Sequence, residues 1–406
     1  MWSLNKVSVS EFPKCLVSYG GPQSNSMLAL AAITNYKNRE LAEEEKEGTT
    51  RMNNNGSRNN NDNDNDNDND NDNISISTPI RFVYYTKKLP RFLKNQPNGN
   101  LFRALSLGME LKELSREEYS NLFEHRSEDN DGGGGREGKR PPMGLMAPAP
   151  NSLYVPQGGA FSSALVGVNR LSEEIYTYWL EHGNDRPLTI FVPGGTCTTA
   201  LCLHHGLKRL SLLADREDDD NGDYSSSAKS MMDIEVVVVP CVGDAAYARK
   251  QMMSLSTQIG AKADDIPAIL QPEPEEQENL TSSSRRKYFT FGKPNKEILE
   301  TFQELQKENN LLVDLLYGAP SFSIMFRHWD EDMKKNKDKP SLSPDLSFDP
   351  NQPLSSGREI MYVHSGGLEG ITSQLLRYQH IGLMKIKDVQ LPGRRNKKKG
   401  TEQTNT

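Results

Sequence analysis

The sequence lacks the cysteine patterns of metal-binding and disulfide-rich proteins. It has only four cysteines in 406 residues, and none of them forms a Cys-x-x-Cys pair. No cluster of histidines completes a set of metal ligands with them, so we expect no bound metal. Because a disulfide scaffold needs cysteines in pairs, we interpret the chain as an intracellular protein with reduced thiols.

Long apolar runs are also missing. No stretch approaches the roughly 20 apolar residues that a transmembrane helix needs. The first residues do not show the basic segment followed by an apolar one that is typical of a signal peptide. We therefore expect no membrane partner and a location inside the cell, either in the cytoplasm or in an organelle.

Positive charge is in deficit over the whole chain. The formal net charge is −7, whereas a protein that binds nucleic acid usually presents a basic face. We therefore expect no nucleic-acid partner. The local exception is Arg394 to Lys399, within residues 393–406, which we interpret as a solvated basic tail.

Hydrophobic residues make up only 35% of the chain, and the polar residues are concentrated in a few segments. These segments carry too little apolar surface to offset the entropy lost on ordering, so we predict that they are disordered insertions. They are residues 39–73, with an Asn-Asp repeat, 126–143, with four consecutive glycines, 216–230, 271–287 and 330–357.

Strands and helices alternate in the rest of the chain. Apolar and β-branched runs predict strands at residues 15–19, 81–86, 153–156, 188–192, 234–239 and 360–364. Helical spacing predicts helices at residues 24–36, 100–113, from 159 to about 181, from 198 onward, and 296–308. Such alternation is typical of α/β proteins with mainly parallel sheets.

Four of the predicted strands are each followed by a pair of glycines and then by a helix. The pairs are Gly20-Gly21, Gly158-Gly159, Gly194-Gly195 and Gly366-Gly367. Ligands of parallel α/β sheets bind at the carboxyl ends of the strands, where helix N-termini offer free N–H groups. The repeated unit therefore favours a polar ligand that carries a phosphate.

The turn from Gly194 to Thr199 is the best candidate for binding that phosphate. Gly194 and Gly195 allow close approach of the backbone, and Thr196, Thr198 and Thr199 add hydroxyl donors. The turn is neither a P-loop nor a dinucleotide fingerprint, because both characteristic spacings are absent. A left-handed turn with threonine caps is the structural alternative.

Three other segments place polar side chains at turns. Gln23, Ser24 and Asn25 begin a helix, where Ser24 could be a simple N-cap or part of a carboxylate-binding turn. Tyr317, directly before Gly318, could be a core residue or an acid/base group. Ser365 could contact a ring nitrogen of a ligand or cap the following helix.

Taken in this order, the segments resemble one group of fold-type II pyridoxal-phosphate enzymes. This group contains 1-aminocyclopropane-1-carboxylate deaminase and D-cysteine desulfhydrase. The matching segments are Gly20-Gly21-Pro22-Gln23-Ser24-Asn25 (G-G-x-Q-S-N), Pro156-Gln157-Gly158-Gly159 (Pro-x-Gly-Gly), Gly194 to Thr199, Tyr317-Gly318 and His364-Ser365-Gly366-Gly367. Together they span most of the chain outside the insertions.

The resemblance implies a fold and an assembly. We expect two three-layer α/β domains with mainly parallel sheets, similar to the β subunit of tryptophan synthase, with the insertions as disordered loops. The smaller domain would be residues 1–125, and the larger, cofactor-binding domain would be residues 144–392. We also expect a homodimer.

The resemblance further implies pyridoxal 5'-phosphate as the cofactor. Asn25 would bond the phenolic oxygen of the cofactor, and the loop containing Gly194, Gly195, Thr196, Thr198 and Thr199 would hold its phosphate. Ser365 would face its pyridine nitrogen.

The same resemblance implies a small amino acid as the substrate. Ser24, with Gln23 beside it, would hold the substrate carboxylate and assist proton transfer. Tyr317 would lie beside the bond between cofactor and substrate, as a catalytic residue.

One departure from the group bears on the reaction. In the deaminases an acidic residue follows the tyrosine and pairs with the pyridine nitrogen, but here that position is Gly318. A neutral partner such as Ser365 makes the cofactor a weaker electron sink. This favours α,β-elimination of the D-cysteine desulfhydrase type, and 1-aminocyclopropane-1-carboxylate deamination is the alternative.

A second departure concerns the lysine that binds the cofactor covalently. In the group this Schiff-base lysine lies upstream of the Q-S-N segment, and carrying the spacing back places it before Met1. Asn5-Lys6 repeats part of the motif, but Lys6 lies too close to the strand and no glycine precedes it. We therefore expect an N-terminally truncated copy, and a cofactor-binding protein without catalysis is a further alternative.

Overall fold

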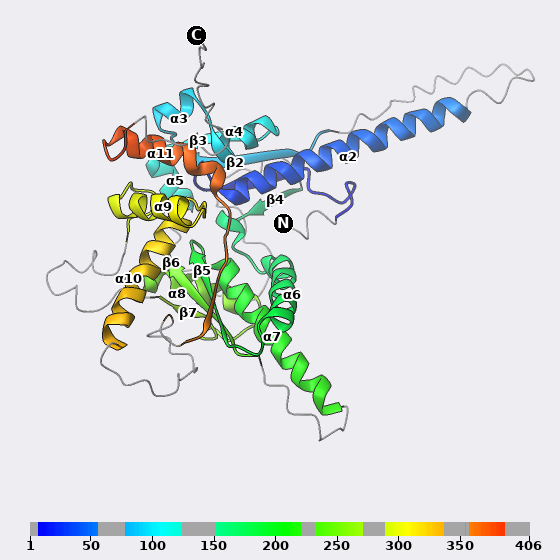
Figure 1. The fold of residues 1–406 in the computed structure, drawn as a ribbon. Helices are drawn as coiled ribbons and strands as arrows, with labels where there is room; N and C mark the ends of the chain where they lie inside the picture. Colours follow the sequence, from blue (N-terminus) through cyan, green and yellow to red (C-terminus); the bar gives the residue numbers. More distant parts are fainter. Residues whose placement is uncertain are drawn as a thin grey trace, which may run out of the picture.

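The computed structural model describes residues 7–55, 78–123, 151–220, 232–270, 289–336, 354 and 357–385. Strands in these ranges form two four-stranded sheets, and every strand pairing within them is parallel (Figure 1). The predicted α/β class with parallel sheets is confirmed. Lys6 and the segment 126–143 lie outside the described residues.

The N-terminal sheet has the strand order β3-β2-β1-β4. Its strands are β1 (Cys15–Tyr19), β2 (Arg81–Lys87), β3 (Glu110–Leu114) and β4 (Ser152–Val155), and its helices are α2 (Asn25–Asn55), α3 (Arg91–Asn95), α4 (Gly99–Ser106) and α5 (Arg116–Phe123). Apolar side chains of α2, α3 and α4 pack with Leu16, Phe82 and Tyr84 in one core cluster. On the other face, the Tyr19 ring stacks on Phe123 of α5 with their centroids 4.0 Å apart.

The C-terminal sheet has the strand order β7-β6-β5-β8. Its strands are β5 (Leu188–Gly194), β6 (Ile234–Pro240), β7 (Ala268–Ile269) and β8 (Glu359–Tyr362). The remaining helices are η1 (Gln157–Gly159), α6 (Ala164–His182), α7 (Thr198–Asp220), α8 (Ala245–Gln258), α9 (Lys296–Glu308), α10 (Gly318–Asn336), η3 (Leu368–Gly370) and α11 (Ile371–His380).

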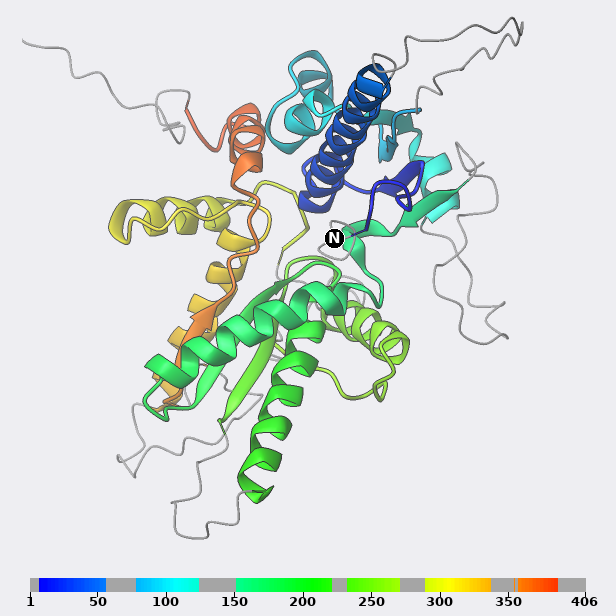
Figure 2. The same ribbon diagram turned by 90° about the vertical axis from the view of Figure 1, so that its right-hand side faces the viewer.

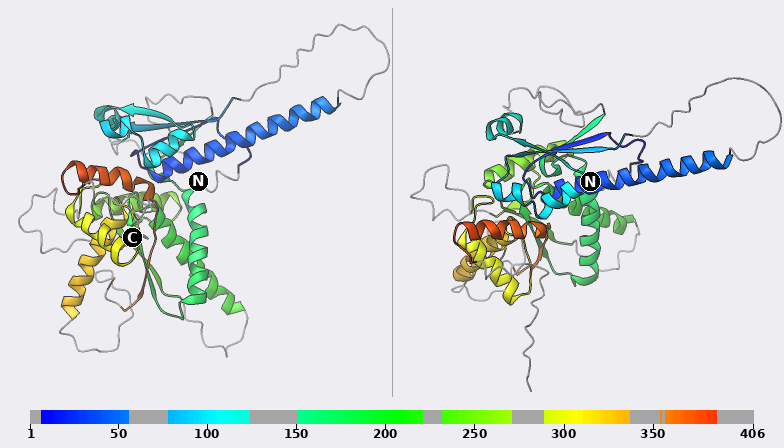
Figure 3. Two further views of the ribbon diagram at one scale, coloured as in Figure 1. Left: turned by 45° about the horizontal axis from the view of Figure 1, so that its top comes forward. Right: turned by 90° about the horizontal axis from the view of Figure 1, so that it is seen from above.

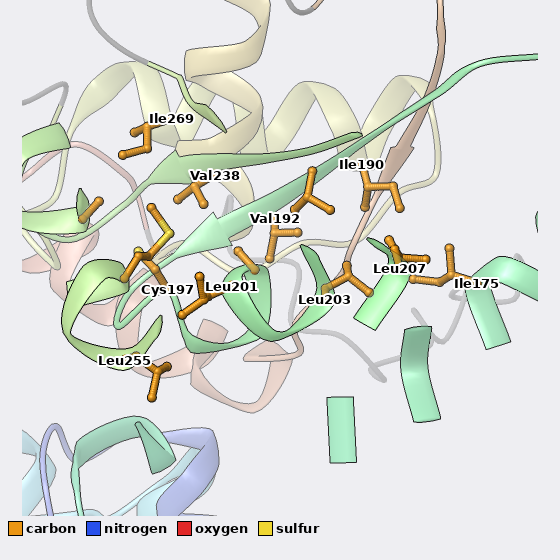
Figure 4. Close-up of a cluster of buried hydrophobic side chains, with 14 of the residues drawn as sticks. Ile175, Ile190, Val192, Cys197, Leu201, Leu203, Leu207, Val238, Leu255 and Ile269 are labelled. Carbon is orange, nitrogen blue, oxygen red and sulfur yellow. The ribbon is translucent and has the colours of Figure 1, made fainter. Parts of the chain in front are cut away.

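Helices cover both faces of this sheet, as Figures 2 and 3 show. On one face, Ile190 and Val192 of β5 and Val238 of β6 pack against Leu201 of α7, in a core that also includes α6 and α8 (Figure 4). On the other face, Phe191 packs with side chains of α10. Because β5 is buried on both sides along its whole length, its sequence is a continuous apolar run.

The predicted strands and helices differ from the structure in a few places. The helix predicted at 100–113 is wrong in its second half, because α4 ends at Ser106 and β3 follows. Gly108, with φ of +90°, adopts a left-handed conformation that ends the helical stretch. The strand β4 lies within the predicted range 144–392, yet it pairs with β1 of the N-terminal sheet.

Three predicted insertions begin with helix instead of disorder. Helix α2 continues to Asn55, α7 to Asp220 and α10 to Asn336, so each enters one of the segments 39–73, 216–230 and 330–357. Residues 39–47 contain five glutamates and one each of Arg, Leu, Ala and Lys, all strong helix formers. Leu41 packs on the core cluster, and the exposed residues 42–47 continue the helix by propensity. Most of each segment, and all of 271–287, lies outside the described residues. No helix in the described ranges has both the length and the hydrophobicity that crossing a bilayer requires.

A buried arginine stabilises the edge of the C-terminal sheet at which strands β5, β6 and β8 begin. The Arg358 side chain is fully buried and forms an ion pair with Asp233, just before β6. Its guanidinium also donates to the carbonyl oxygen of Leu188 at 2.9 Å and to Thr189 Oγ1 at 3.0 Å. One side chain therefore joins the starts of β5, β6 and β8.

We predict that Arg358→Met lowers the free energy of unfolding by about 2–3 kcal/mol, because buried acceptors lose their only charged donor. The matched control is Arg186→Met, since Arg186 pairs with Glu359 at the exposed surface. That change is expected to cost less than about 1 kcal/mol. Equal losses in urea denaturation for the two variants would contradict the structural role of Arg358.

Candidate active site

A cavity of about 700 Å³ lies at the carboxyl ends of strands from both sheets. Segments that follow β1 and β4 line one side of it, and segments that follow β5 and β8 line the other. Nine of the ten predicted site residues line this cavity: Gln23, Ser24, Asn25, Gly195, Thr196, Thr198, Thr199, Tyr317 and Ser365. Gly194 is not among the lining residues, because it is the buried last residue of β5.

The loop between β5 and α7 presents several donors to the cavity. Cys197 adopts a left-handed conformation with φ of +58°, which turns the chain sharply into α7. The hydroxyl oxygens of Thr196 and Thr198 lie 2.9 Å apart, and α7 begins at Thr198, so its first N–H groups face the same end of the cavity. Burial raises the pKa of Cys197 to about 12, so its thiol adds no negative charge to the loop. The loop can therefore bind an anion.

Tyr317 lies directly against this loop. A Cβ atom on Gly195 would lie 3.1 Å from Cε1 and 3.2 Å from the hydroxyl of Tyr317, so glycine makes room for the ring. Phe291 also lines the cavity, and its ring packs against that of Tyr317 with the ring centroids 5.4 Å apart. Burial raises the pKa of Tyr317 above its ordinary value, so the phenol stays protonated at neutral pH and can donate a hydrogen bond.

A buried carboxylate fixes the position of Tyr317. Asp314 Oδ1 accepts hydrogen bonds from the backbone N–H groups of Leu316 and Tyr317, each at 2.8 Å. Asp314 Oδ2 accepts from the N–H of Gly318, at 2.9 Å, where α10 begins. Burial raises the pKa of Asp314, and these three N–H groups oppose that rise by stabilising the charged form. No role for Asp314 was predicted from the sequence.

The Gln-Ser-Asn turn is the N-terminus of α2. Ser24 Oγ accepts from the backbone N–H of Met27 at 3.3 Å, which is the geometry of a helix cap, and lies 2.9 Å from Ser26 Oγ. The helix cap that the sequence offered as one alternative for Ser24 is therefore present as a contact to Met27. Its predicted catalytic and substrate-binding role stays a prediction.

The side chains on either side of Ser24 are held by helix α4. Gln23 Oε1 accepts from the backbone N–H of Asn100 at 2.8 Å, and Gln23 Nε2 donates to the carbonyl oxygen of Asn98 at 3.1 Å. Asn100 Nδ2 donates to the Gln23 carbonyl at 3.0 Å and to Asn25 Oδ1 at 2.9 Å. Asn25 Nδ2 then donates to the carbonyl oxygen of Ser365 at 3.0 Å, which joins the turn to the segment after β8.

These residues fit pyridoxal 5'-phosphate at its phosphate end. The cofactor phosphate is a dianion, and the β5–α7 loop supplies threonine hydroxyls, a helix N-terminus and a closely approaching glycine. Tyr317 and Ser365 line the same cavity and could contact its ring. None of the described residues that line the cavity is a lysine.

The sequence interpretation missed Arg377 and Gln374 of α11, which also line the cavity. They are ordinary polar residues on an amphipathic helix, and no spacing pattern marks either of them as a site residue. They face the cavity because α11 follows η3, whose Gly370 lies against Gln23. Only the packing of the last helix against the Gln-Ser-Asn turn places them there.

No protein-family model matches the sequence, and no curated protein matches it. Two solved structures share part of its arrangement. A crystal structure of an ACC deaminase homologue has 13% sequence identity and a TM-score of 0.48, over 91% of this chain and 80% of that chain. A fungal L-serine ammonia-lyase from Rhizomucor miehei has 13% identity and a TM-score of 0.33, over 74% of this chain and 75% of that chain.

We predict that Asn100→Ala releases the Gln-Ser-Asn turn, because Asn100 is fully buried and its amide holds both Gln23 and Asn25. The loss should lower the free energy of unfolding by about 1–3 kcal/mol. It should also speed amide hydrogen exchange in residues 21–27. The control is Asn98→Ala, which keeps the backbone carbonyl that Gln23 uses. Unchanged exchange in the Asn100 variant would show that the turn does not depend on it.

Proposed function

We propose that the cavity binds pyridoxal 5'-phosphate together with a small amino acid, and that the protein is a lyase of the D-cysteine desulfhydrase type. The observation that carries this proposal is the placement of two turns. The donor-rich β5–α7 loop and the Gln-Ser-Asn turn face one cavity, although they come from different sheets. When bound, the cofactor delocalises the negative charge left on the Cα atom of an amino acid.

The phosphate end of the cofactor is assigned to the β5–α7 loop. Thr196 and Thr198 would donate their hydroxyl hydrogens, and Gly195 would let the phosphate approach the backbone. The loop is fixed between a fully buried strand and a long helix, so it needs little rearrangement to bind. Thr199 would complete the set from the first turn of α7.

The ring and the substrate are assigned to the other polar residues that line the cavity. Tyr317, protonated and held through Asp314, would donate a hydrogen bond close to the reacting atoms. Ser365 would offer a neutral partner to the ring nitrogen, and the Ser24 hydroxyl would hold or move a proton at the substrate. Asn25 would offer its remaining amide hydrogen to the phenolic oxygen.

The neutral partner is the reason for preferring elimination. Asp314 is the only acidic residue among the described residues that line the cavity, and its oxygens already accept three backbone N–H groups. Elimination from D-cysteine consumes one water and yields sulfide, ammonia and pyruvate. Deamination of 1-aminocyclopropane-1-carboxylate and cofactor binding without catalysis are the competing functions.

We predict that the double variant Thr196→Val, Thr198→Val binds pyridoxal 5'-phosphate at least about tenfold more weakly, because two donors to a charged group are lost. Equilibrium dialysis measures the affinity. The matched control is Thr257→Val, because Thr257 is an exposed residue of α8 that donates to the carbonyl of Met253 and does not line the cavity. Equal affinities for the double variant and the unaltered chain would place the phosphate elsewhere.

We predict that the chain, supplied with the cofactor, releases sulfide and pyruvate from D-cysteine faster than ammonia from 1-aminocyclopropane-1-carboxylate. Tyr317→Phe should lower that rate at least about tenfold, since it removes the donor beside the reacting atoms and keeps the ring. Faster release of ammonia would favour the deaminase alternative. Cofactor binding with neither product would favour the non-catalytic alternative.

A further inference from the structure

Arg377 is a half-buried cation without a carboxylate partner in the described part of the chain. Its one side-chain hydrogen bond is to Gln374 Oε1, at 3.3 Å. Two other arginines, the partly exposed Arg327 and the fully buried Arg358, are paired with Glu297 and Asp233. Burial lowers the pKa of Arg377 from its ordinary value, and the neighbouring Tyr378 phenol opposes that effect only in part. A guanidinium held in this way is a binding site for an anion.

Arg377 is the only cationic residue among the described residues that line the large cavity. It also lines an adjoining cavity of about 350 Å³, which shares Gly21, Pro22 and Gln23 with the large one. No residue of the β5–α7 loop lines the smaller cavity. Arg377 therefore borders both cavities together with residues of the Gln-Ser-Asn turn, and its guanidinium lies beside Gly292, where an added Cβ atom would be 3.5 Å from Arg377 Nη1.

The direction of the side chain agrees with this position. Gly370, at the end of η3, packs against Gln23, where its Cβ would lie 3.7 Å from Gln23 Cβ. Arg377 follows two helical turns later, and long side chains on a helix point back toward its N-terminus. The hydrogen bond from Arg377 to Gln374, three residues earlier, has this direction.

The Gln-Ser-Asn turn has few free donors of its own. Both polar atoms of the Gln23 side chain are bonded to α4, and Asn25 Oδ1 is bonded to Asn100. The turn therefore offers the Ser24 hydroxyl, the remaining amide hydrogen of Asn25 and backbone N–H groups, and no charged side chain. A guanidinium from outside the turn would add a charge-assisted contact to a substrate carboxylate there.

We infer that Arg377, positioned by Gln374, holds the α-carboxylate of the amino-acid substrate from the α11 side, with Ser24 on the other side. This inference rests on the proposed function, because it assumes that the ligand is an amino acid. It names Arg377 as the group that selects ligands with a free carboxylate. Amino-acid amides of the same shape would be rejected.

The test compares D-alanine with D-alaninamide, which differ only at the carboxylate. Neither has a leaving group on Cβ, so binding is measured without elimination, by ligand-observed NMR titration. The unaltered chain should prefer D-alanine at least tenfold, and Arg377→Met should abolish that preference while leaving cofactor affinity unchanged. Arg377→Lys, which keeps the charge, should retain part of the preference. The matched control is Arg103→Met, because Arg103 is an exposed residue paired with Glu369 and does not line the cavity.

Three results would overturn the inference. Arg377→Met and Arg377→Lys could both keep the full preference for D-alanine. The Met variant could lose cofactor affinity, which would assign the guanidinium to the phosphate. The Met variant could also keep the preference for D-alanine over D-alaninamide and lose the ability to discriminate aspartate from asparagine. That result would assign Arg377 to an anion on the substrate side chain.

The inference and the proposed function can fail separately. If the unaltered chain takes up no pyridoxal 5'-phosphate, the proposed function fails. Binding of D-alanine and D-alaninamide is then compared on the chain without the cofactor. A preference that depends on Arg377 would still support the carboxylate site.

Discussion

The hydrogen bonds of Asn100 are the constraint on which the arrangement of the cleft depends. This fully buried amide fixes the Gln23 carbonyl and the Asn25 side chain, and its backbone N–H holds the Gln23 amide oxygen. Asn25 is then oriented to bond Ser365, beyond the last strand of the other sheet. One residue of a short helix therefore determines which polar atoms of the turn remain for a ligand. The free ones are the Ser24 hydroxyl, one amide hydrogen of Asn25 and backbone groups, so any charged contact to a ligand comes from elsewhere in the cavity.

Parallel strand pairing explains why residues far apart in the sequence meet in this cleft. The carboxyl ends of parallel strands lie at one edge of a sheet. The N-terminal sheet contributes the ends of β1 and β4 to the cavity, and the C-terminal sheet contributes those of β5, β6 and β8. The strands themselves are rigid, since β5 and most of β6 are buried on both faces. Arg358 secures the opposite edge of the same sheet. Rigidity at one edge allows the loops at the other edge to be specialised for binding.

Much of this organisation could be predicted from the sequence, and the exceptions have physical causes. The strands β1, β5 and β6 are apolar runs whose burial shows in their composition, and the glycine turns after β1 and β5 mark strand ends. Strand β3 was missed because it is an edge strand with charged residues that resembles the end of a helix. The role of Asn100 depends on contacts with residues 75 and 77 positions away, which no local pattern encodes. Arg377 was missed because only the packing of α11 against the Gln-Ser-Asn turn brings it to the cavity. Asp314 makes local hydrogen bonds, but an aspartate before a helix is common and does not by itself mark a site.

Helix α2 separates the site from the low-complexity sequence by a long distance. The helix has 31 residues, so its two ends lie about 45 Å apart. Its first residue, Asn25, belongs to the cavity, and its last residue, Asn55, lies four residues before the Asn-Asp run that begins at Asn59. The run therefore joins the chain at the end of the helix remote from the cavity. A change in the number of Asn-Asp units would leave the sequence of every residue that lines the cavity as it is.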